Sequence, residues 1–354
     1  MKLNTYLPII LAGLAGATAA NAQIGFTLTG STAFRSITID RGLALFDTGS
    51  TFQTNNATTG LITGLGTMSN AIPSLGNNQV KLRLSFSGSI EGMNDVKNLA
   101  AVTCAEIGGG STNVVPDVAL SDVFPATANP PIPNSTFQRV VIGIVPIVFV
   151  KNNGIAGLTN LTQDSATFLM AANGPGIPQN FFGGTSGADV YFIGRDSGSG
   201  TRLTAEKCTK FSGSPTLWTT NGAGAYVTTN GLPSGGLVKN VVQGKTDSIG
   251  YLSLGDYSGS FTNSATVLNY NGIPFNITNV YNGKFTIWGY QHMMSRTSGG
   301  LSATQQLIFN ALKTKITDIN YQSTNSLYKG RFGELNAMEV QRNVDGGPLS
   351  SLIF

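Results

Sequence analysis

The sequence predicts an α/β fold, and three of its features favour this prediction. Strand-like segments lead through small-residue turns into helical spacing at residues 24–46, 80–101 and 190–207. Residues 140–150 are continuously apolar, as in a strand that is buried on both faces of a sheet. Residues 304–316 have the spacing of an amphipathic helix. Strands that alternate with helices through short turns are typical of helices packed on a largely parallel sheet.

The N-terminal residues predict export from the cytoplasm. Lys2 provides a positive charge, residues 7–17 form a short apolar segment, and Ala20-Asn21-Ala22 matches a cleavage site. We therefore interpret residues 1–22 as a signal peptide and expect the mature chain to begin at Gln23. No later segment has the roughly 18 uninterrupted apolar residues of a transmembrane helix, so we expect a periplasmic or secreted protein.

Composition narrows the classes of function. The 354 residues are enough for two domains at the usual size of roughly 100–200 residues each. The formal net charge is only +4 and no block of Lys or Arg occurs, which gives nucleic-acid binding no support. His292 is the single histidine and no Cys-x-x-Cys pair occurs, so we expect neither a metal site nor a cofactor.

The first part of the chain contains two strand–turn–helix junctions. Residues 24–30 alternate like a strand, and a helix is expected over about 31–46. Residues 48–78 are rich in Gly, Thr and Asn, which predicts loops with short strands. Residues 80–86 alternate cleanly, and a small-residue turn leads from them into helical spacing over 93–101.

The next segments are expected to carry the chain into a second domain. Residues 113–120 are strand-like and place Asp122 just past the end of the strand. The apolar strand over 140–150 contains Pro146, which marks a bend. A helix is expected to begin near Thr162.

The third junction has the composition of an anion site. Residues 190–193 predict a strand, the glycines at 198 and 200 allow close backbone approach, and Ser199 or Thr201 can cap the helix that follows. The N–H groups of that helix's first turn would point into the turn, and Arg195 adds a full positive charge. A solvent-exposed turn is the alternative interpretation of the same composition.

The remaining residues predict further alternation of helices and strands. A short helix is expected over 235–243 and a strand over 248–254, followed by strands and turns over 267–285. Residues 288–294 are expected to return the chain to the first domain, where the helix over 304–316 completes the fold.

Five motifs resemble, in order, the landmarks of the phosphate-binding proteins of phosphate ABC transporters. They are Thr29-Gly30-Ser31-Thr32-Ala33-Phe34, Gly88-Ser89 through Gly92, Ser121-Asp122, Arg195-Asp196-Ser197-Gly198-Ser199-Gly200-Thr201 and Ser248-Ile249-Gly250-Tyr251. The fourth is the most specific. The resemblance implies a two-lobed type II periplasmic binding protein fold with a two-strand hinge and a ligand cleft between the lobes. It also implies a monomer that captures phosphate or a related oxyanion for the membrane subunits of an ABC transporter.

Carried over residue by residue, the resemblance implies a set of ligand-binding positions. These are Thr32, Ala33, Phe34, Ser89, Asp122, Arg195, Ser199, Gly200 and Thr201. Several of the contacts would come from backbone N–H groups. Which of residues 31–34 donates stays open, because the first turn is shorter than in some members and Arg35-Ser36 stands where many members carry a proline. Arg202 either adds charge to the cleft or faces solvent.

Asp122 has a chemical use in an anion site. Phosphate near neutral pH still carries a proton that a carboxylate can accept, whereas sulfate carries none and would place two anionic oxygens against each other. We therefore expect Asp122 to discriminate between the two anions. An ordinary turn or helix cap is the alternative role for this residue.

The expected hinge defines the lobes. We expect residues 23–135 and 285–354 to form lobe I and residues 136–284 to form lobe II. Cys104 and Cys208 then lie in different lobes, where a disulfide between them would restrict closure, so two free thiols are expected.

Other functions fit the sequence less well. Ser199 lacks the glycine two positions before it that a nucleophile elbow needs, and Gly244-Lys245-Thr246 lacks the upstream glycine of a P-loop, since Lys239 occupies that position. We therefore expect a binding protein rather than a phosphatase or another enzyme. A secreted or surface oxyanion-binding protein without a transport role is the main alternative.

Overall fold

The computed structural model describes residues 23–55, 61–172, 177–257, 264–318 and 335–352. The predicted signal peptide, residues 1–22, lies outside them. None of the helices in the described ranges is both long enough and apolar enough to cross a membrane.

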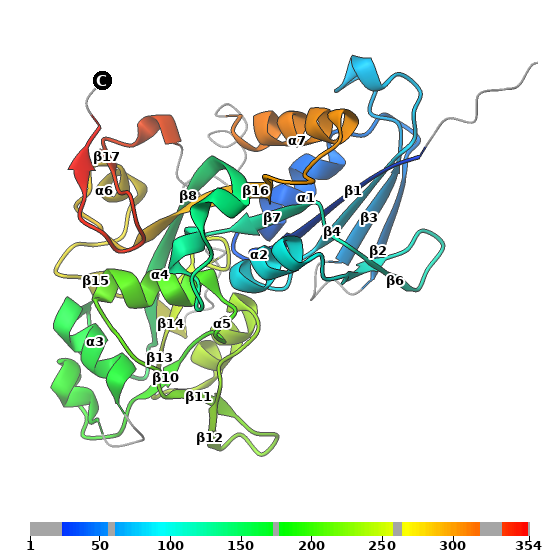
Figure 1. The fold of residues 1–354 in the computed structure, drawn as a ribbon. Coiled ribbons are helices and arrows are strands. Elements are labelled where there is room, and N and C mark those ends of the chain that lie inside the picture. The colour runs from blue at the N-terminus through cyan, green and yellow to red at the C-terminus, as the bar shows by residue number, and fades with distance from the viewer. Residues whose placement is uncertain (1–22, 56–60, 173–176, 258–263, 319–334, 353–354) are drawn as a thin grey trace, which may run out of the picture.

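Two α/β lobes share one pair of long antiparallel strands (Figure 1). The two strands are β8, Phe137–Asn152, and β16, Trp288–Arg296, which pair from Trp288 opposite Pro146 to Arg296 opposite Phe137. The strand order of the combined sheet is β10-β13-β8-β16-β7-β1-β4-β3-β2, with β14 also pairing with β8. On one side β8 pairs with β13 and β14, and on the other β16 pairs with β7, so the two lobes are joined through the β8–β16 pair.

Lobe I is the half that is built on β1, β4 and β7. Its strands are β1 Ile24–Gly30, β2 Thr51–Asn55, β3 Leu61–Gly66, β4 Val80–Ser85, β5 Val102–Ala105, β6 Ser111–Val114 and β7 Val118–Ser121. Its helices are α1 Arg35–Leu43, α2 Ser89–Asn98 and α7 Ala303–Ile316. Strand β1 lies parallel to both β4 and β7, so the carboxyl ends of these three strands meet at one edge of the sheet.

Lobe II is the half that is built on β10, β13 and the second part of β8. Its strands are β9 Asn160–Leu161, β10 Tyr191–Ile193, β11 Leu217–Thr220, β12 Tyr226–Thr229, β13 Ser248–Ser253, β14 Ala265–Val267 and β15 Asn269–Tyr270. Its helices are α3 Gln163–Ala171, α4 Gly200–Thr209, α5 Gly235–Gly244 and α6 Ile277–Tyr281. Two short strands near the C-terminus, β17 Val340–Gln341 and β18 Ser350–Ser351, pair with each other beside α6 (Figure 1).

Each lobe has its own hydrophobic core. Leu28 and Leu82 from the sheet pack with Phe34 and with Leu312 of α7 in lobe I. The larger core of lobe II contains Ile144 and residues 147–150 of β8, whereas Ile142 and Val145 of the same strand belong to the lobe I core. Burial in both cores explains the continuous apolar run that the sequence contains. Met338 also belongs to the lobe II core, and residues 335–352 supply further apolar side chains that pack against it. The C-terminal residues therefore pack against lobe II, whereas the expected division grouped them with lobe I.

One predicted strand is two separate strands. Residues 113–120 were expected to be continuous, but β6 ends at Val114 and β7 begins at Val118. Pro116 lies between them and has no N–H to donate, and the side chain of Asp117 accepts a hydrogen bond from the N–H of Thr27 at 2.8 Å. The prediction was wrong because apolar, strand-forming residues stand on both sides of this break.

Cys104 and Cys208 are both buried free thiols, as predicted. Cys104 lies on β5 of lobe I, and Cys208 lies on α4 and belongs to the lobe II core.

Candidate functional site

The carboxyl ends of three parallel strands place small-residue turns next to one another in lobe I. The N–H of Ser31, after β1, donates to the carbonyl of Leu120 at 2.8 Å, and the N–H of Gly88, after β4, donates to the carbonyl of Gly30 at 2.9 Å. Gly30 has a φ of +112°, and a Cβ on it would overlap the Leu120 carbonyl oxygen. The turns that precede α1 and α2 and follow β7 therefore converge at one edge of the sheet, the usual ligand edge of such sheets.

Lobe II contributes the start of α4. Ser199 caps this helix by accepting a hydrogen bond from the N–H of Arg202 at 3.3 Å. The turn before the cap touches lobe I directly, because the N–H of Ile90 in α2 donates to the carbonyl of Gly198 at 3.0 Å. A Cβ on Gly200 would overlap the carboxylate of Asp122, so a glycine is needed at this lobe contact.

Asp122 lies at the contact between the lobes. Its side chain accepts hydrogen bonds from the hydroxyl of Ser89 in lobe I and from the hydroxyl of Thr201 in lobe II, the second at 2.9 Å. The residue is only 1% exposed. Burial raises the pKa of the Asp122 carboxyl, and the two hydroxyl donors and Arg195 act in the opposite direction. The hydroxyls of Ser89 and Thr201 therefore connect Asp122 to both lobes.

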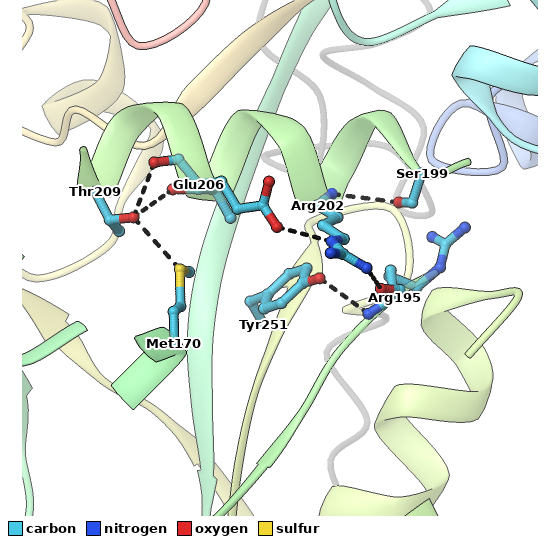
Figure 2. A network of polar contacts seen from close by, with 8 residues as sticks. Met170, Arg195, Ser199, Arg202, Glu206, Thr209 and Tyr251 are labelled. Atoms are coloured by element: carbon cyan, nitrogen blue, oxygen red, sulfur yellow. Dashed lines mark hydrogen bonds and ion pairs between the residues drawn. The ribbon is translucent and has the colours of Figure 1, made fainter. Parts of the chain in front are cut away.

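The main chain of Arg195 makes hydrogen bonds with two side chains of lobe II. Its N–H donates to the Tyr251 hydroxyl at 2.9 Å, and its carbonyl accepts from Arg202 at 3.3 Å. Arg202 in turn forms an ion pair with Glu206 at 2.7 Å, and its side chain is only 12% exposed, so it does not point freely to solvent. Figure 2 shows this chain of contacts along α4, with the Arg195 main chain between Tyr251 and Arg202.

The guanidinium group of Arg195 contacts neutral oxygens. It donates to the carbonyls of Leu232 and Pro233, each at 3.0 Å, and to the hydroxyl of Thr32 in lobe I at 3.3 Å. The residue is 1% exposed, and none of the ion pairs within the described residues includes it. A buried cation without a contacting carboxylate favours the binding of an anion.

Backbone donors surround the same contact. The N–H groups of Thr32, Ala33, Ser89, Gly200 and Thr201 make no hydrogen bond to another residue within the described ranges. All five belong to the turns or first residues of α1, α2 and α4, where helices leave N–H groups unsatisfied. The hydroxyl of Ser31 is also buried and has no partner among the described residues. This combination of N–H groups, hydroxyl and guanidinium is suited to an oxyanion.

The structure brings together most of the residues that the sequence predicted. Thr32, Ser89, Asp122, Arg195, Ser199, Gly200 and Thr201 all lie at the lobe contact. The side chains of Ala33 and Phe34 are instead buried in the lobe I core, so any contact of these two residues with a ligand would have to come from the backbone. Sequence reasoning left Ser31 as one of four candidate donors in the first turn, and the isolation of its hydroxyl becomes visible only once its buried surroundings are known.

Two positions that hold Arg195 were also not assigned. Leu232 and Pro233 accept from the guanidinium through their carbonyls, which no side-chain pattern reveals. Tyr251 was named as part of a motif, but its bond to the Arg195 main chain was not foreseen. Within the described ranges, no group of three or more His, Cys, Asp or Glu side chains could hold a metal ion.

Comparisons with known proteins identify the fold. No protein-family model matches this chain, and no curated protein matches it. A protein from Clostridium perfringens that is assigned as a phosphate ABC transporter substrate-binding protein, solved with bound phosphate, is similar in structure. It has a TM-score of 0.57 at 15% identity, over 88% of this chain and 99% of that chain. An ABC-type phosphate transport receptor from Vibrio cholerae gives a TM-score of 0.52 at 15% identity, over 82% of this chain and 93% of that chain.

A periplasmic protein that is assigned to metal binding is also similar, with a TM-score of 0.51 at 9% identity over 88% of this chain and 96% of that chain. The likeness therefore gives the chain the two-lobed α/β fold of periplasmic binding proteins. The ligand has to be inferred from the site itself, since one fold serves several ligands.

Proposed function

We propose that this protein is an extracytoplasmic solute-binding protein that captures phosphate, or a related oxyanion, between its two lobes. Its partners would be the membrane subunits of an ABC transporter, and it would act as a monomer in the periplasm or outside the cell. The two phosphate-transport proteins with the same fold support this proposal at the level of fold.

One observation carries the proposal. The buried Arg195 guanidinium has no contacting carboxylate among the described residues, and five unbonded backbone N–H groups lie on the turns around the lobe contact. A tetrahedral oxyanion needs many donors and partial charge neutralisation, and these groups provide both. Donors come from both lobes, so an anion bound there would hold the lobes together.

Asp122 would select the protonation state of the ligand. An ionised carboxylate accepts the proton of monohydrogen phosphate and repels sulfate, which has none. Burial raises the pKa of Asp122, and a protonated carboxyl would no longer repel sulfate. Discrimination against sulfate should therefore be strong at neutral pH and weaken as the pH falls through the pKa of Asp122.

We also propose a division of the chain into lobes. Residues 23–135 and helix α7 form lobe I, and residues 136–284 form lobe II, joined at β8 and β16 as a hinge. Residues 335–352 are assigned to lobe II, because Met338 and its neighbours pack into that core. Lobe motion would then occur about the paired strands β8 and β16.

The test is calorimetric titration of the mature protein with phosphate and sulfate between pH 5 and pH 8.5. We expect phosphate binding throughout, and sulfate binding that increases as the pH falls. Asp122→Asn should bind sulfate at neutral pH, because an amide can donate where the carboxylate repels. Asp95→Asn, which removes a carboxylate from α2 outside the lobe contact, is the matched control and should keep wild-type selectivity. If wild-type protein binds neither anion, the proposed function is wrong.

A further inference from the structure

A pocket with a volume of about 500 Å³ lies within lobe I. Its lining comes from the ends of β3, β4 and β5 and from helix α2, and every lining residue falls between Leu61 and Thr103. The pocket therefore belongs to one lobe and does not depend on the contact between the lobes. Sites for small organic ligands are typically about 300–1,000 Å³, so this pocket is large enough for a small molecule.

One face of α2 supplies polar side chains to the pocket. Glu91, Asn94 and Asp95 are all in the lining, and residues three and four positions apart lie on the same face of a helix. None of these three side chains forms an ion pair or a hydrogen bond with another residue in the described ranges. No Lys, Arg or His is among the described lining residues. A ligand group that enters the pocket therefore meets two unpaired carboxyl groups.

A buried hydroxyl of β4 indicates a ligand independently of these charges. Ser85 lines the pocket although the residue is only 6% exposed. Its hydroxyl makes no hydrogen bond within the part of the chain that the structure describes, whereas the Ser87 hydroxyl lies 3.5 Å from that of Thr29. Most buried hydroxyls in proteins have a hydrogen-bond partner. The Ser85 oxygen is thus available to accept a hydrogen bond from a group in the pocket.

The cations on the same face of β4 are already paired. Arg83 lies two residues before Ser85, on the same face of the strand, and forms an ion pair with Glu106 at 3.6 Å. Lys81, two residues earlier, forms an ion pair with the same carboxylate at 2.6 Å. Both cations are therefore directed at Glu106, which is not among the lining residues.

The surroundings of the two carboxyl groups disfavour their negative charge. Burial raises the pKa of Asp95. Burial also raises the pKa of Glu91, and the negative charges of Asp196 and Asp95 act in the same direction, whereas Arg195 opposes them. A cation placed between Glu91 and Asp95 would compensate both groups.

We propose that this pocket binds a small aliphatic amine whose ammonium groups lie against Glu91 and Asp95. An ammonium group has three N–H donors, so it can donate to a carboxylate and to the Ser85 hydroxyl together. Apolar side chains line the rest of the pocket and suit a short methylene chain; they are Leu61, Ala101 and Val102. The inference goes beyond the proposed function and does not depend on it, because the pocket shares no group with the anion site around Arg195.

A bare metal ion fits this pocket less well than an amine. Ca²⁺ takes six to eight oxygen ligands, and Mg²⁺ demands near-ideal octahedral geometry. The described residues contain no group of three or more His, Cys, Asp or Glu side chains that could hold a metal ion. Two carboxylates beside an apolar wall are instead suited to an organic cation.

The experiment is calorimetric titration of the mature protein near neutral pH at physiological ionic strength, with three probes of matched length. These are putrescine, which has two ammonium groups, butylamine, which has one, and 1,4-butanediol, which has none. We expect putrescine to bind at least about tenfold tighter than 1,4-butanediol, as hydrogen bonds to charged groups provide, with butylamine between them.

The variant for this test is the double substitution Glu91→Gln and Asp95→Asn, which keeps the size of both side chains. It should reduce the preference for putrescine over 1,4-butanediol to less than about twofold, and Ser85→Ala should weaken putrescine binding about threefold. Glu339→Gln is the matched control, because it removes an exposed carboxylate outside the pocket. Thermal unfolding of each variant checks that the fold is retained.

Three results would overturn the inference. It is wrong if putrescine binds no tighter than 1,4-butanediol, and equally wrong if Glu339→Gln weakens putrescine binding as much as the double substitution does. Displacement of putrescine from the wild-type protein by millimolar Ca²⁺ would show that the carboxyl groups serve a metal ion instead. None of these results bears on the proposed function, which the titrations with phosphate and sulfate test separately.

Discussion

Removing the guanidinium of Arg195 should abolish tight oxyanion binding. In Arg195→Ala the site loses its one buried cation at the lobe contact and the donor to Thr32, while the backbone N–H groups remain. Truncating a buried charged partner costs about 2–5 kcal/mol of binding free energy, which corresponds to a loss of about 30-fold to 5,000-fold in affinity. Arg195→Lys should recover only part of this, because an ammonium group cannot reproduce the planar fork.

The same substitution should change the stability of the ligand-free protein less than it changes binding. Three hydrogen bonds of the guanidinium are lost, each worth about 1.5–3 kcal/mol for a charged donor. The burial of a cation without a contacting carboxylate also costs several kcal/mol, and this cost disappears with the side chain. The two effects oppose each other, so the free energy of unfolding without ligand should change by less than their separate sizes.

The assay is calorimetric titration with orthophosphate together with thermal unfolding with and without the anion. Arg342→Ala is the matched control, because Arg342 is also a buried arginine of lobe II but contacts Cys208 and the Thr286 carbonyl, away from the lobe contact. The control should lower thermal stability and keep the affinity for phosphate. Wild-type affinity in Arg195→Ala would refute the reasoning and move the site elsewhere.

Three further predictions follow from individual contacts. Gly200→Ala should hold the lobes apart, because its Cβ would overlap the Asp122 carboxylate, and small-angle scattering with phosphate should then show no compaction. Ser31→Ala should lower phosphate affinity about tenfold without destabilising the ligand-free fold, since its hydroxyl has no partner among the described residues; equal affinities by calorimetry would contradict this. Burial raises the pKa of Asp345 from 3.8 to about 6, so the folded state favours the neutral form of this carboxyl. Up to ~3 kcal/mol of the free energy of unfolding should therefore be lost as the pH rises from about 4 to about 6. Denaturant unfolding of Asp345→Asn at several pH values should lack this loss.

Local physical rules predicted the parts of the fold that depend on neighbouring residues. The turn from residue 194 to the start of α4 could be predicted, because a strand, glycines and a capping serine are close in sequence. The long apolar strand β8 could be predicted because burial on both faces leaves no polar alternation. The site residues on these turns were predicted from a resemblance to a family. That resemblance rests on five motifs occurring in the family's order, which is more specific than any one of the motifs.

Contacts between distant segments could not be predicted from local patterns. Leu232 and Pro233 hold Arg195 through backbone carbonyls, and a carbonyl is present at every position of the chain. Residues 335–352 pack against lobe II although α7, which precedes them, packs in lobe I, and no periodicity encodes this change. Such contacts depend on where the folded lobes place each surface.

Under the proposed function, one ligand compensates both buried charged groups of the site, Asp122 and Arg195. Asp122 is a carboxyl whose pKa is raised by burial, and Arg195 is a buried guanidinium that contacts neutral oxygens, yet no ion pair within the described residues joins them. Closure without a ligand therefore buries two groups whose charges are poorly compensated. Monohydrogen phosphate offers negative oxygens to Arg195 and a proton to Asp122, so the same molecule satisfies both. Sulfate satisfies only Arg195, and discrimination between the anions would then appear as a difference in how readily the lobes close.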